Sequence, residues 1–494
     1  MAFQSHQLHF VMVPLPCPGH LIPTTDMARL FAQRGVIITI VTTPLNVIRI
    51  KSIINRAIDS GLPIRLVQLQ LPLHEAGLPE GCENIDTVPS RGLFRNFFDA
   101  VSKLQQPLEQ LLEEMEPSPS CIIADKNLAW TGDITTKFHI PRILFDGTSC
   151  FNLLCGHSIL ASKVNESASV SDLEPFVVPG LPDRIELTRA QLPTNLNTSL
   201  KDFKDLHEKI NASEEGAYGV VVNSFVELEP EYVKGYRKAK GDKVWCIGPV
   251  SLSNKADLDK AQRGNKSSID ENQCLNWLDL WPQNSVVYAC LGSLSRLTLL
   301  QLIELGLGLE ACEQPFIWVI REDKNGEIEK WIIEDGFEER TKGRGLLIRG
   351  WAPQVLILSH PAIGGFLTHC GWNSMLEAVC SGVPMVTWPM FADQFFNEKL
   401  VVQVLKIGEK VGAEIAIPLG DEEKFGILVK REEVRDALGK IMTEGKERED
   451  RRERARKLAE MAKIAIEEGG SSYLDIALLI EDIRKLSMGL KPKS

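Results

Sequence analysis

Short apolar runs alternate with segments of helical periodicity along most of the chain. Leu8–Leu15 is mostly apolar, apolar residues then recur at helical spacing after Pro23, and Val36–Val41 is rich in β-branched side chains. This order predicts a strand, a helix with Pro23 at its first position, and a second strand. Further strands are predicted at Cys121–Ala124, Arg142–Phe145 and Gly219–Val222, with helical patterning between them, as at Phe94–Met115. The alternation is typical of a parallel sheet covered by helices.

A polar segment, Ser251–Gln273, interrupts this pattern and lacks apolar periodicity, so we place an interdomain linker there. A second alternating series follows, with a helix at Leu299–Cys312 and strands at Val286–Leu291, Phe316–Ile320, Leu346–Ile348, Gly365–Thr368 and Pro384–Thr387. The whole predicts two doubly wound α/β domains, at residues 1–250 and 274–470, joined by the linker at 251–273 and followed by a helix at 471–494 that packs back on the first domain. Because such sheets bind ligands at the carboxyl ends of their strands, we expect the active site between the domains.

Composition and charge narrow the classes of function. The 494 residues are 44% hydrophobic and 24% charged, as in a globular protein, and the net charge of −11 comes with no basic patch for nucleic acid. A run of mixed charges at Glu444–Lys457 predicts an exposed helix. The eleven cysteines form no C-x-x-C pair, and the first apolar stretch, Phe10–Leu15, is too short for a signal peptide or a membrane span. We therefore expect a cytoplasmic protein with reduced thiols and no stable membrane insertion.

The most unusual stretch of the sequence is Trp351–Gln394, which reads WAPQVLILSHPAIGGFLTHCGWNSMLEAVCSGVPMVTWPMFADQ. Within it, a predicted strand runs through His369 into a glycine turn and a helix that begins near Asn373. Free backbone N–H groups and the positive end of the helix dipole would point at the same place. This turn is therefore a predicted phosphate site.

Side chains around the turn extend the prediction to a nucleoside diphosphate. His369, Asn373 and Ser374 supply donors, and Glu377 supplies a carboxylate for ribose hydroxyls. Trp351 stands at a strand end, where its indole can stack on a planar base. Each residue also has a structural interpretation, as a helix N-cap for Asn373, a partly buried histidine for His369 and a core tryptophan for Trp351. Their crowding favours the binding site.

A candidate base follows the first predicted strand. His20 comes after Gly19 at the turn from strand to helix, at the ligand side of the sheet. An imidazole with an ordinary pKa near ~6.5 can remove a proton from a hydroxyl group. Asp125 ends the predicted strand at Cys121–Ala124, again on the ligand side. Without further context, a histidine at this position is more simply a turn residue.

The stretch Trp351–Gln394 resembles the C-terminal signature box of plant secondary-product glycosyltransferases, of glycosyltransferase family 1, almost residue for residue. The resemblance continues in the segments VPLPCPGHLIP, ADKNLAW, CLGSL and EEGGSS, and it is closest to the branch acting on flavonoids, terpenoids and plant hormones. It implies a GT-B fold of two Rossmann-like domains, a UDP-sugar held mainly by the C-terminal domain, and an acceptor bound by the N-terminal domain. It also implies inversion at the anomeric carbon without a metal or another cofactor.

The resemblance assigns a role to each matching position. His20 resembles the general base, and Asp125 the carboxylate that fixes its tautomer and stabilises the imidazolium. The residues matching the donor site are Trp351 for uracil, Gln354 and Glu377 for the ribose, Ser293, His369, Asn373 and Ser374 for the diphosphate, and Thr148, Trp372, Asp393 and Gln394 for the sugar. In this family a glutamine at the last of these positions goes with glucose, so we expect UDP-glucose as the donor.

Two positions depart from close relatives of this family. Cys17 stands in the turn before Gly19 where a glutamine often precedes the glycine, and Asp146 replaces a commonly seen histidine. Both are expected near the acceptor, so the resemblance does not carry an acceptor preference to this chain. The acceptor pocket is expected in the loops Gly81–Phe98 and Asn152–Leu181, whose phenylalanines suit either an apolar acceptor or helix packing.

The leading interpretation is a monomeric, inverting glucosyltransferase that makes O-glycosides of a small apolar metabolite such as a flavonoid, triterpenoid or hormone. The same chemistry with UDP-galactose or UDP-glucuronate is an alternative. A nicotinamide-dependent oxidoreductase would need G-x-G-x-x-G after a strand, with an acidic residue about 20 positions later. Neither Pro16–His20 nor Leu291–Arg296 matches that pattern. A non-catalytic UDP-sugar-binding protein would be expected to lack the base or its carboxylate, and both are present.

Overall fold

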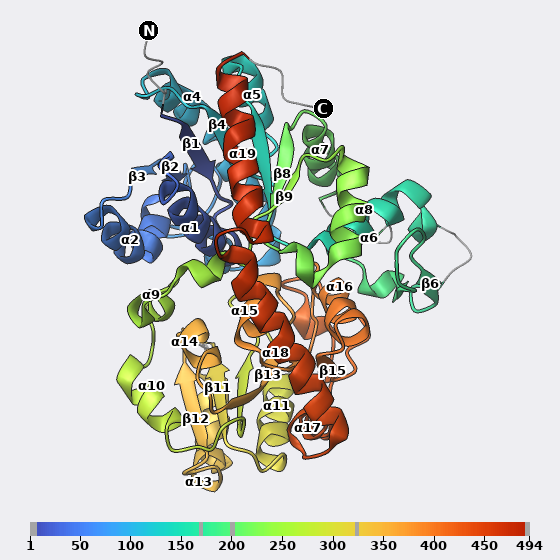
Figure 1. Ribbon diagram of the computed structural model, residues 1–494. Helices are drawn as coiled ribbons and strands as arrows, with labels where there is room; N and C mark the ends of the chain where they lie inside the picture. The colour runs from blue at the N-terminus through green and yellow to red at the C-terminus, as the bar shows by residue number, and fades with distance from the viewer. Residues whose placement is uncertain (1–6, 167–170, 198–202, 322–325, 490–494) are drawn as a thin grey trace. The chain divides into compact units, whose positions relative to one another are not determined.

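The computed structural model describes residues 7–166, 171–197, 203–321 and 326–489, and the chain divides into two compact units. The first unit comprises Met1–Cys150, Lys201–Lys255 and Ile464–Ser494, and the second comprises Phe151–Leu200 and Ala256–Lys463. Each unit is built around one parallel β-sheet with helices on both faces (Figure 1). Within the described residues, no helix combines the length and the apolar character needed to cross a membrane.

The first sheet has seven strands in the order β3-β2-β1-β4-β5-β8-β9, and every neighbouring pair is parallel. Its strands are β1 His9–Val13, β2 Ile37–Thr42, β3 Ile64–Gln68, β4 Cys121–Asp125, β5 Arg142–Asp146, β8 Gly219–Val222 and β9 Val244–Cys246. All residues of β1, β2, β4, β5 and β8 are buried, which explains why they read as continuous apolar or β-branched runs. The predicted strands are confirmed to within two residues at each end.

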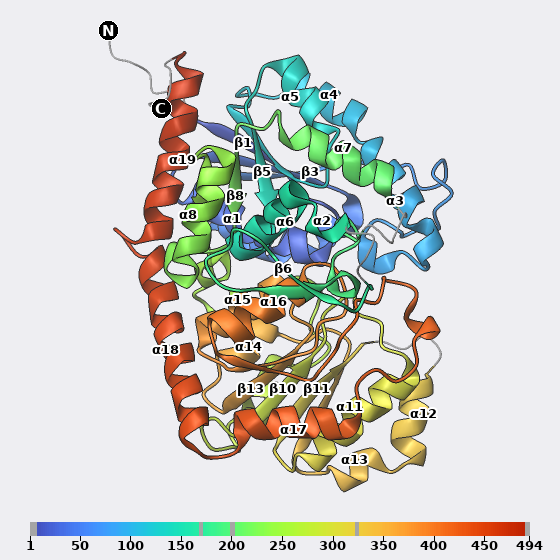
Figure 2. The same cartoon turned by 90° about the vertical axis from the view of Figure 1, so that its right-hand side faces the viewer.

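Helices cover both faces of this sheet (Figure 2). They are α1 Pro18–Ala32, α2 Pro44–Asp59, α3 Phe94–Ser102, α4 Gln105–Glu113, α5 Thr131–Phe138, α7 Lys204–Glu214, α8 Pro230–Lys240 and α19 Ser471–Ser487. The segment Phe94–Met115, predicted from one helical pattern, forms two helices that are separated at Lys103 and Leu104.

Helix α1 begins five residues before the position predicted for it. Pro18, not Pro23, occupies the first turn, and Pro23 lies inside the helix. A proline is tolerated at a first helical position because that residue's N–H has no partner within the helix. His20 is therefore the third residue of α1 rather than part of a preceding turn, and its N–H donates to the carbonyl of Cys17 at 3.0 Å.

Helix α19, near the C-terminus, packs within the first unit. Ile476, Leu479, Ile480 and Ile483 lie on one face and join the cluster that contains Met12 and other residues of β1 and β2. Burying each such side chain contributes on the order of 2 kcal/mol. A polar anchor adds to this packing, because a carboxylate of α19, Asp475, accepts from Arg237 at 2.6 Å and from the N–H of Cys246 at 2.7 Å.

The second sheet has six parallel strands in the order β12-β11-β10-β13-β14-β15. They are β10 Val286–Cys290, β11 Phe316–Ile320, β12 Gly345–Arg349, β13 Ile363–Thr368, β14 Met385–Thr387 and β15 Gly408–Lys410. Its helices are α9 Asp257–Ala261, α10 Glu271–Leu278, α11 Leu299–Ala311, α12 Glu327–Glu334, α13 Phe337–Arg340, α14 Gln354–Leu358, α15 Trp372–Ser381, α16 Gln394–Lys399, α17 Arg431–Met442 and α18 Lys446–Ile466. The core on one face joins α11, α12 and α17 to the sheet.

Two segments differ from the sequence prediction in their place or burial. Residues 151–200 group with the second unit. This segment carries most of helix α6 Cys150–Ser162 and the antiparallel hairpin of β6 Pro175–Val177 and β7 Glu186–Thr188. Residues 167–170 and 198–200 lie outside the described residues.

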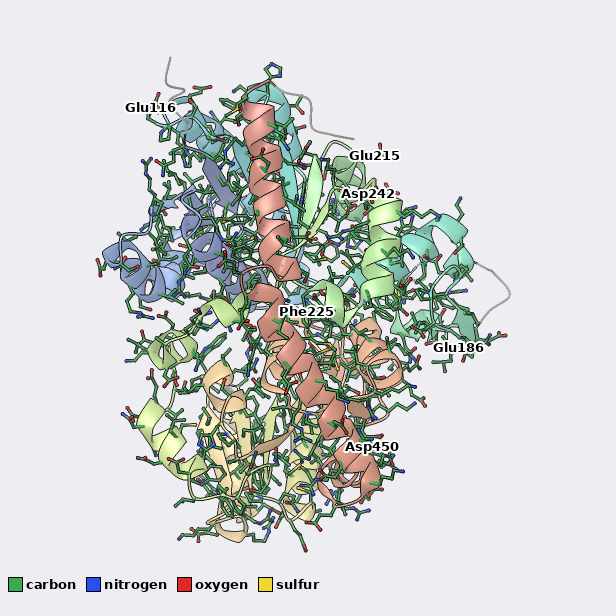
Figure 3. The ribbon with its side chains drawn as sticks, viewed as in Figure 1. Glu116, Glu186, Glu215, Phe225, Asp242 and Asp450 are labelled. Carbon is green, nitrogen blue, oxygen red and sulfur yellow. The ribbon has the colours of Figure 1, made fainter. Side chains whose placement is uncertain are left out.

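The mixed-charge run forms α18, but Arg451 and Arg452 are buried while Asp450 is exposed (Figure 3). Arg451 is satisfied inside by Glu409, which a charge pattern alone does not reveal.

The strand order places one topological switch point in each sheet. In the first sheet, successive strands from β1 to β3 are added toward one edge and those from β4 onward toward the other, so the order reverses between β1 and β4. In the second sheet, the order reverses in the same way between β10 and β13. Ligands of open α/β sheets bind outside the carboxyl ends of the strands at such a point. The site residues predicted from the sequence are therefore expected at these two switch points, one in each unit.

Candidate functional site

The switch point of the first sheet joins His20 and Asp125. His20 lies in the first turn of α1, the helix that follows β1, and Asp125 is the last residue of β4, which pairs with β1. The imidazole Nδ1 of His20 lies 2.5 Å from Oδ2 of Asp125. The carboxylate is fully buried, whereas the imidazole is 27% exposed. The dyad thus has a shielded carboxylate and a base that solvent-borne ligands can reach.

Asp125 is held as a carboxylate. Its Oδ1 accepts from the backbone N–H of Asn127 at 3.0 Å and from the side-chain amide at 2.9 Å. Burial alone would raise the pKa of Asp125, but the charge of His20 and the hydrogen bonds from His20 and Asn127 outweigh it, so the pKa lies below its ordinary value. The ionised carboxylate requires Nδ1 of His20 to carry the proton, which leaves Nε2 as the basic nitrogen.

The end of β5 contributes the neighbours of the dyad. Gly147 lies against the imidazole, since a Cβ on this glycine would stand 3.7 Å from Nδ1 of His20. Thr148 follows it and is buried. Asp146, the residue that departs from the family's usual histidine, forms an ion pair of 2.6 Å with Lys126. Burial raises the pKa of Asp146 and Lys126 opposes this effect only in part.

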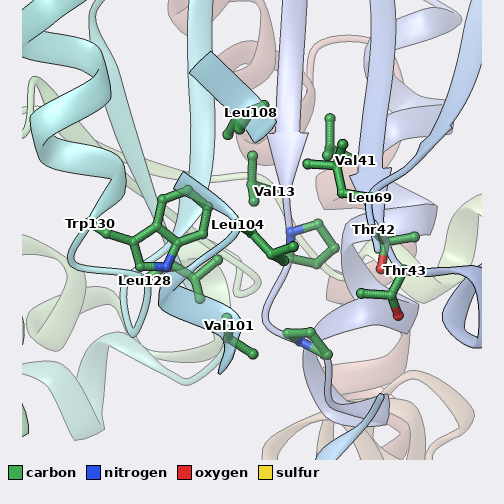
Figure 4. A pocket seen from close by; sticks show the side chains of 12 residues that line it. Val13, Val41, Thr42, Thr43, Leu69, Val101, Leu104, Leu108, Leu128 and Trp130 are labelled. Atoms are coloured by element: carbon green, nitrogen blue, oxygen red, sulfur yellow. The ribbon is translucent and has the colours of Figure 1, made fainter. Parts of the chain in front are cut away.

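A small cavity lined mainly by apolar side chains lies in the first unit (Figure 4). Its lining comes from the strand ends of β1 and β2, from α3 and α4, and from the loop after β4. Pro16 on one side precedes His20 in the chain, and Leu128 and Trp130 on the other follow Asp125. Phe94 and Phe97 of the predicted acceptor loop are instead buried residues of α3.

The switch point of the second sheet joins the ends of β10 and β13. After β13, His369 and Cys370 lead to Gly371, the N-cap of α15. His369 fits between two glycines: a Cβ on Gly292 would lie 2.5 Å from its Cε1, and a Cβ on Gly371 would overlap its Nε2. Ser293 directly follows Gly292. The predicted diphosphate residues Ser293, after β10, and His369, after β13, are thus brought together by a contact that only glycines permit.

His369 is neutral at physiological pH. Burial lowers its pKa to about 4, and its Nδ1 is buried without a hydrogen-bond partner among the described residues. Trp372, Asn373 and Ser374 form the first turn of α15, where helix N–H groups have no intrahelical partner. Because Gly371 is the N-cap, Asn373 is not the capping residue that a purely structural interpretation would make it.

The predicted nucleoside residues form one hydrogen-bonded cluster. Gln354, the first residue of α14, donates from Nε2 to Ser374 at 2.9 Å and to Oε2 of Glu377 at 2.8 Å. Trp351 is half-buried, so it is not a core tryptophan. Its indole N–H donates at 3.2 Å to the backbone carbonyl of Arg263, whose guanidinium pairs with Glu377. The sequence offered no signal for Arg263, which stands in the polar segment assigned to the linker.

Two of the predicted sugar residues, Asp393 and Gln394, lie at the start of α16. Asp393 precedes the helix and accepts from Asn397 at 2.9 Å, and Asn397 also donates to the carbonyl of Cys370 at 2.9 Å. Gln394 is buried, and its Oε1 accepts from the N–H groups of Met390 and Phe391 at 2.8 and 3.1 Å. Only the amide nitrogen of Gln394 is left to donate to a ligand. Asn397 was missed, although its spacing of four residues from Asp393 on one helix is a signal that could have found it.

No group of three or more histidine, cysteine, aspartate or glutamate side chains suited to holding a metal ion occurs in the part of the chain that the structure describes. The residue types at the first switch point are those that general-base chemistry requires, and those at the second are the ones that a diphosphate and nucleoside site requires.

Comparison with known proteins places the chain in a family. A family model described as glycosyltransferase, N-terminal domain, matches residues 6–252, and one described as UDP-glucoronosyl and UDP-glucosyl transferase matches residues 272–415. UDP-glycosyltransferase 73C5 of Arabidopsis thaliana is 53% identical over 485 residues, 98% of each chain.

Solved structures show the same fold. The crystal structure of UGT73P12 from Glycyrrhiza uralensis, complexed with glycyrrhetinic acid 3-O-monoglucuronide, has a TM-score of 0.90 and 37% identity, covering 98% of this chain and 97% of that one. UGT89C1 of Arabidopsis thaliana, complexed with UDP-L-rhamnose, has a TM-score of 0.74 and 30% identity, covering 97% and 99%. The chain therefore belongs to the plant UDP-glycosyltransferase family, in its 73C group, with the GT-B fold and the activity of a UDP-glycosyltransferase.

Proposed function

We propose that the enzyme transfers glucose from UDP-glucose to a hydroxyl group of a small apolar plant metabolite, with inversion at the anomeric carbon. The observation that carries this proposal is the His20–Asp125 dyad, in which a buried carboxylate lies 2.5 Å from Nδ1 of a partly exposed imidazole. The dyad supplies a base for an acceptor hydroxyl, and the second unit supplies the donor site. In this division the N-terminal unit binds the acceptor and the C-terminal unit the UDP-sugar.

The proposed reaction is a single displacement. Nε2 of His20 removes the proton of the acceptor hydroxyl while that oxygen forms a bond to C1 of the sugar and the bond from C1 to the β-phosphate oxygen breaks. Attack from the face opposite UDP inverts the configuration. Asp125 stabilises the imidazolium that forms, as in other histidine–carboxylate pairs. The proton then leaves to solvent, and UDP and the glucoside are the products.

The departing UDP carries negative charge that the second unit is suited to meet. The first turn of α15 presents helix N–H groups and the positive end of the helix dipole. His369 contributes as a neutral N–H donor, because its pKa of about 4 excludes an imidazolium near pH 7. We propose that Ser293, Asn373 and Ser374 complete the diphosphate site and that Trp372 contacts the sugar. The helix dipole and these donors take the place that a metal ion holds in other diphosphate sites.

Glucose is the proposed sugar because of Asp393 and Gln394. Asp393 is oriented by Asn397, and Gln394 retains one amide nitrogen for a sugar hydroxyl. A carboxylate and an amide donor suit adjacent equatorial hydroxyls. Donors nevertheless differ among similar proteins, since the UGT89C1 structure contains UDP-L-rhamnose. UDP-galactose and UDP-glucuronate are therefore the donors to compare with UDP-glucose.

An apolar acceptor is supported by the cavity of the first unit, which is lined almost entirely by aliphatic, proline and tryptophan side chains. The similar protein from Glycyrrhiza uralensis is described as bound to glycyrrhetinic acid 3-O-monoglucuronide. We place flavonoids, triterpenoids and hormone-like alcohols in the acceptor class, and a cytoplasmic monomer as the working form.

The test is transfer by the purified chain from UDP-glucose, UDP-galactose and UDP-glucuronate to a panel of flavonols, triterpenoids and hormone-like alcohols, with EDTA present. Products read by mass spectrometry should gain one hexose with UDP-glucose, and NMR of the glucoside should show the inverted anomer. Preferred transfer from another donor would refute the assignment of glucose. A retained anomeric configuration would refute the single displacement.

A further inference from the structure

Arg263 lies outside every predicted site and outside any helix or strand, two residues after α9. It is nevertheless buried, with 7% of its side chain exposed. Its guanidinium Nη1 pairs with Oε1 of Glu377, whose side chain is equally buried. The two residues are 114 positions apart in the chain and belong to the same unit. A buried ion pair of this kind connects the polar segment to the first helix turns of the proposed donor site.

The carboxylate of Glu377 is held from two sides. Arg263 occupies Oε1, while Gln354 donates to Oε2 at 2.8 Å. Each carboxylate oxygen has two lone-pair sites, so both oxygens keep a position for a further donor. Because Arg263 and Gln354 each hold one oxygen of the carboxylate, the remaining lone pairs of Glu377 have a fixed orientation. Two vicinal hydroxyls of a ribose are donors of the kind that a carboxylate accepts.

The backbone around Arg263 also fixes Trp351. The carbonyl of Arg263 accepts the indole N–H at 3.2 Å. Five residues on, Ser268 accepts from the N–H of Trp351 at 2.9 Å through its hydroxyl, and its own N–H donates to the carbonyl of Trp351 at 2.8 Å. One short segment thereby sets both the ring that we propose to stack on uracil and the carboxylate that we propose for the ribose.

A buried ion pair is weak evidence for a stabilising role, because the cost of desolvating two charges offsets much of their attraction. The pair with Glu377 is better explained by what it fixes. Resting on the proposed UDP-sugar site, we propose that Arg263 is a positioning residue for the nucleoside end of the donor: it orients Glu377 toward the ribose hydroxyls and, through its carbonyl, orients Trp351.

The role makes a prediction about ligand discrimination that simple destabilisation does not. A hydrogen bond from a hydroxyl to a fixed carboxylate changes affinity by roughly 10- to 100-fold. The wild type should therefore bind UDP that much more tightly than 2′-deoxy-UDP, as measured by calorimetry. Arg263→Ala should weaken the binding of UDP and so bring the ratio of the two affinities, for UDP and for 2′-deoxy-UDP, close to one. It should leave the affinity for inorganic pyrophosphate unchanged. Arg263→Lys should fall between, since an ammonium keeps the charge but not the planar fork.

Arg451→Ala is the matched control. Arg451 has 5% of its side chain exposed, pairs with Glu409 and Glu447, and belongs to the same unit without touching the proposed donor site. Its removal should lower the unfolding temperature without changing the ratio of the two nucleotide affinities. In a Glu377→Gln background, Arg263→Ala should have no further effect on that ratio, because the group that it positions is already changed.

The outcomes separate the inference from the function on which it rests. A wild type that discriminates, together with an Arg263→Ala variant that keeps the discrimination, would overturn only the role of Arg263. An equal loss of UDP and pyrophosphate binding in that variant would do the same. A wild type that binds neither nucleotide would overturn the donor site and, with it, the role of Arg263.

Discussion

Replacing Asp125 by asparagine should remove the charge that stabilises the histidine–carboxylate pair while keeping its shape. In the wild type, Asn127 donates to Oδ1 of Asp125 from its backbone N–H at 3.0 Å and from its side-chain amide at 2.9 Å. The side-chain oxygen of the asparagine can still accept these two hydrogen bonds. The amide nitrogen would face Nδ1 of His20, which must then accept a hydrogen bond. The ring proton moves to Nε2, so the nitrogen that should take the acceptor proton no longer can.

The size of the effect follows from the electrostatics of the pair. Charges about 4 Å apart interact by roughly 4 kcal/mol at an effective dielectric constant near 20. With about 1.4 kcal/mol for each factor of ten in rate, loss of this stabilisation lowers kcat by about 1,000-fold. That value lies within the roughly 100- to 10,000-fold range of general-base catalysis. UDP affinity should stay within about twofold, since the nucleotide residues belong to the other unit.

Initial rates at saturating donor and acceptor measure kcat, and calorimetry measures UDP binding. Asp475→Asn is the matched control, because Asp475 is also a buried carboxylate of the first unit that pairs with a cation, Arg237, at 2.6 Å. It should lower the unfolding temperature and leave kcat almost unchanged. A loss of kcat below about tenfold in Asp125→Asn, or an equal loss in the control, would show that the carboxylate of Asp125 does not support the base.

Three further results are expected. Gly292→Ala should weaken UDP binding roughly tenfold or more, because its Cβ would stand 2.5 Å from the ring of His369. Gly343→Ala is the control: its φ of +86° is similar to the +80° of Gly292, but the space around it is open, so it should cost only backbone strain. If calorimetry gave the two variants equal affinities for UDP, the close contact between Gly292 and His369 would not matter for binding. Burial raises the pKa of Glu398 to about 7 from 4.5, so the free energy of unfolding of the wild type should fall as pH rises from 4.5 through 7. Glu398→Gln should therefore be more stable than the wild type by up to about 3 kcal/mol at pH 8 but by little at pH 5. An equal difference at both pH values in urea unfolding would contradict this. Gln394→His should lower the kcat/KM for UDP-glucose relative to UDP-galactose, and an unchanged ratio would remove the sugar role of Gln394.

Buried parallel strands were the most predictable elements. Gly219–Val222 and Phe316–Ile320 match the structure residue for residue, because strands buried on both faces must be apolar throughout. Strands β3 and β15, each at the edge of its sheet, were missed for the complementary reason. Strand β3 exposes Arg65 and Gln68, and β15 is the short sequence Gly408–Lys410, so neither carries an apolar run.

The candidate site was predictable where it follows from chain-local rules. Asp125 ends a strand, His20 lies in the first turn of the helix that follows a strand, and the turn before α15 pairs a strand end with a helix N-terminus. Arg263 and Gly292 were not predictable, because their importance lies in contacts with Glu377 and His369 that only folding creates. A polar arginine and a lone glycine have no local pattern that distinguishes them from ordinary loop residues.

The most direct test of the whole account compares transfer and UDP binding in His20→Ala. Transfer from UDP-glucose should fall by roughly 100- to 10,000-fold while the Kd for UDP stays within about twofold, because the proposed base and the proposed donor site belong to different units. Retained transfer would show that His20 is not the base. A parallel loss of UDP binding would contradict the separation of the base from the donor site.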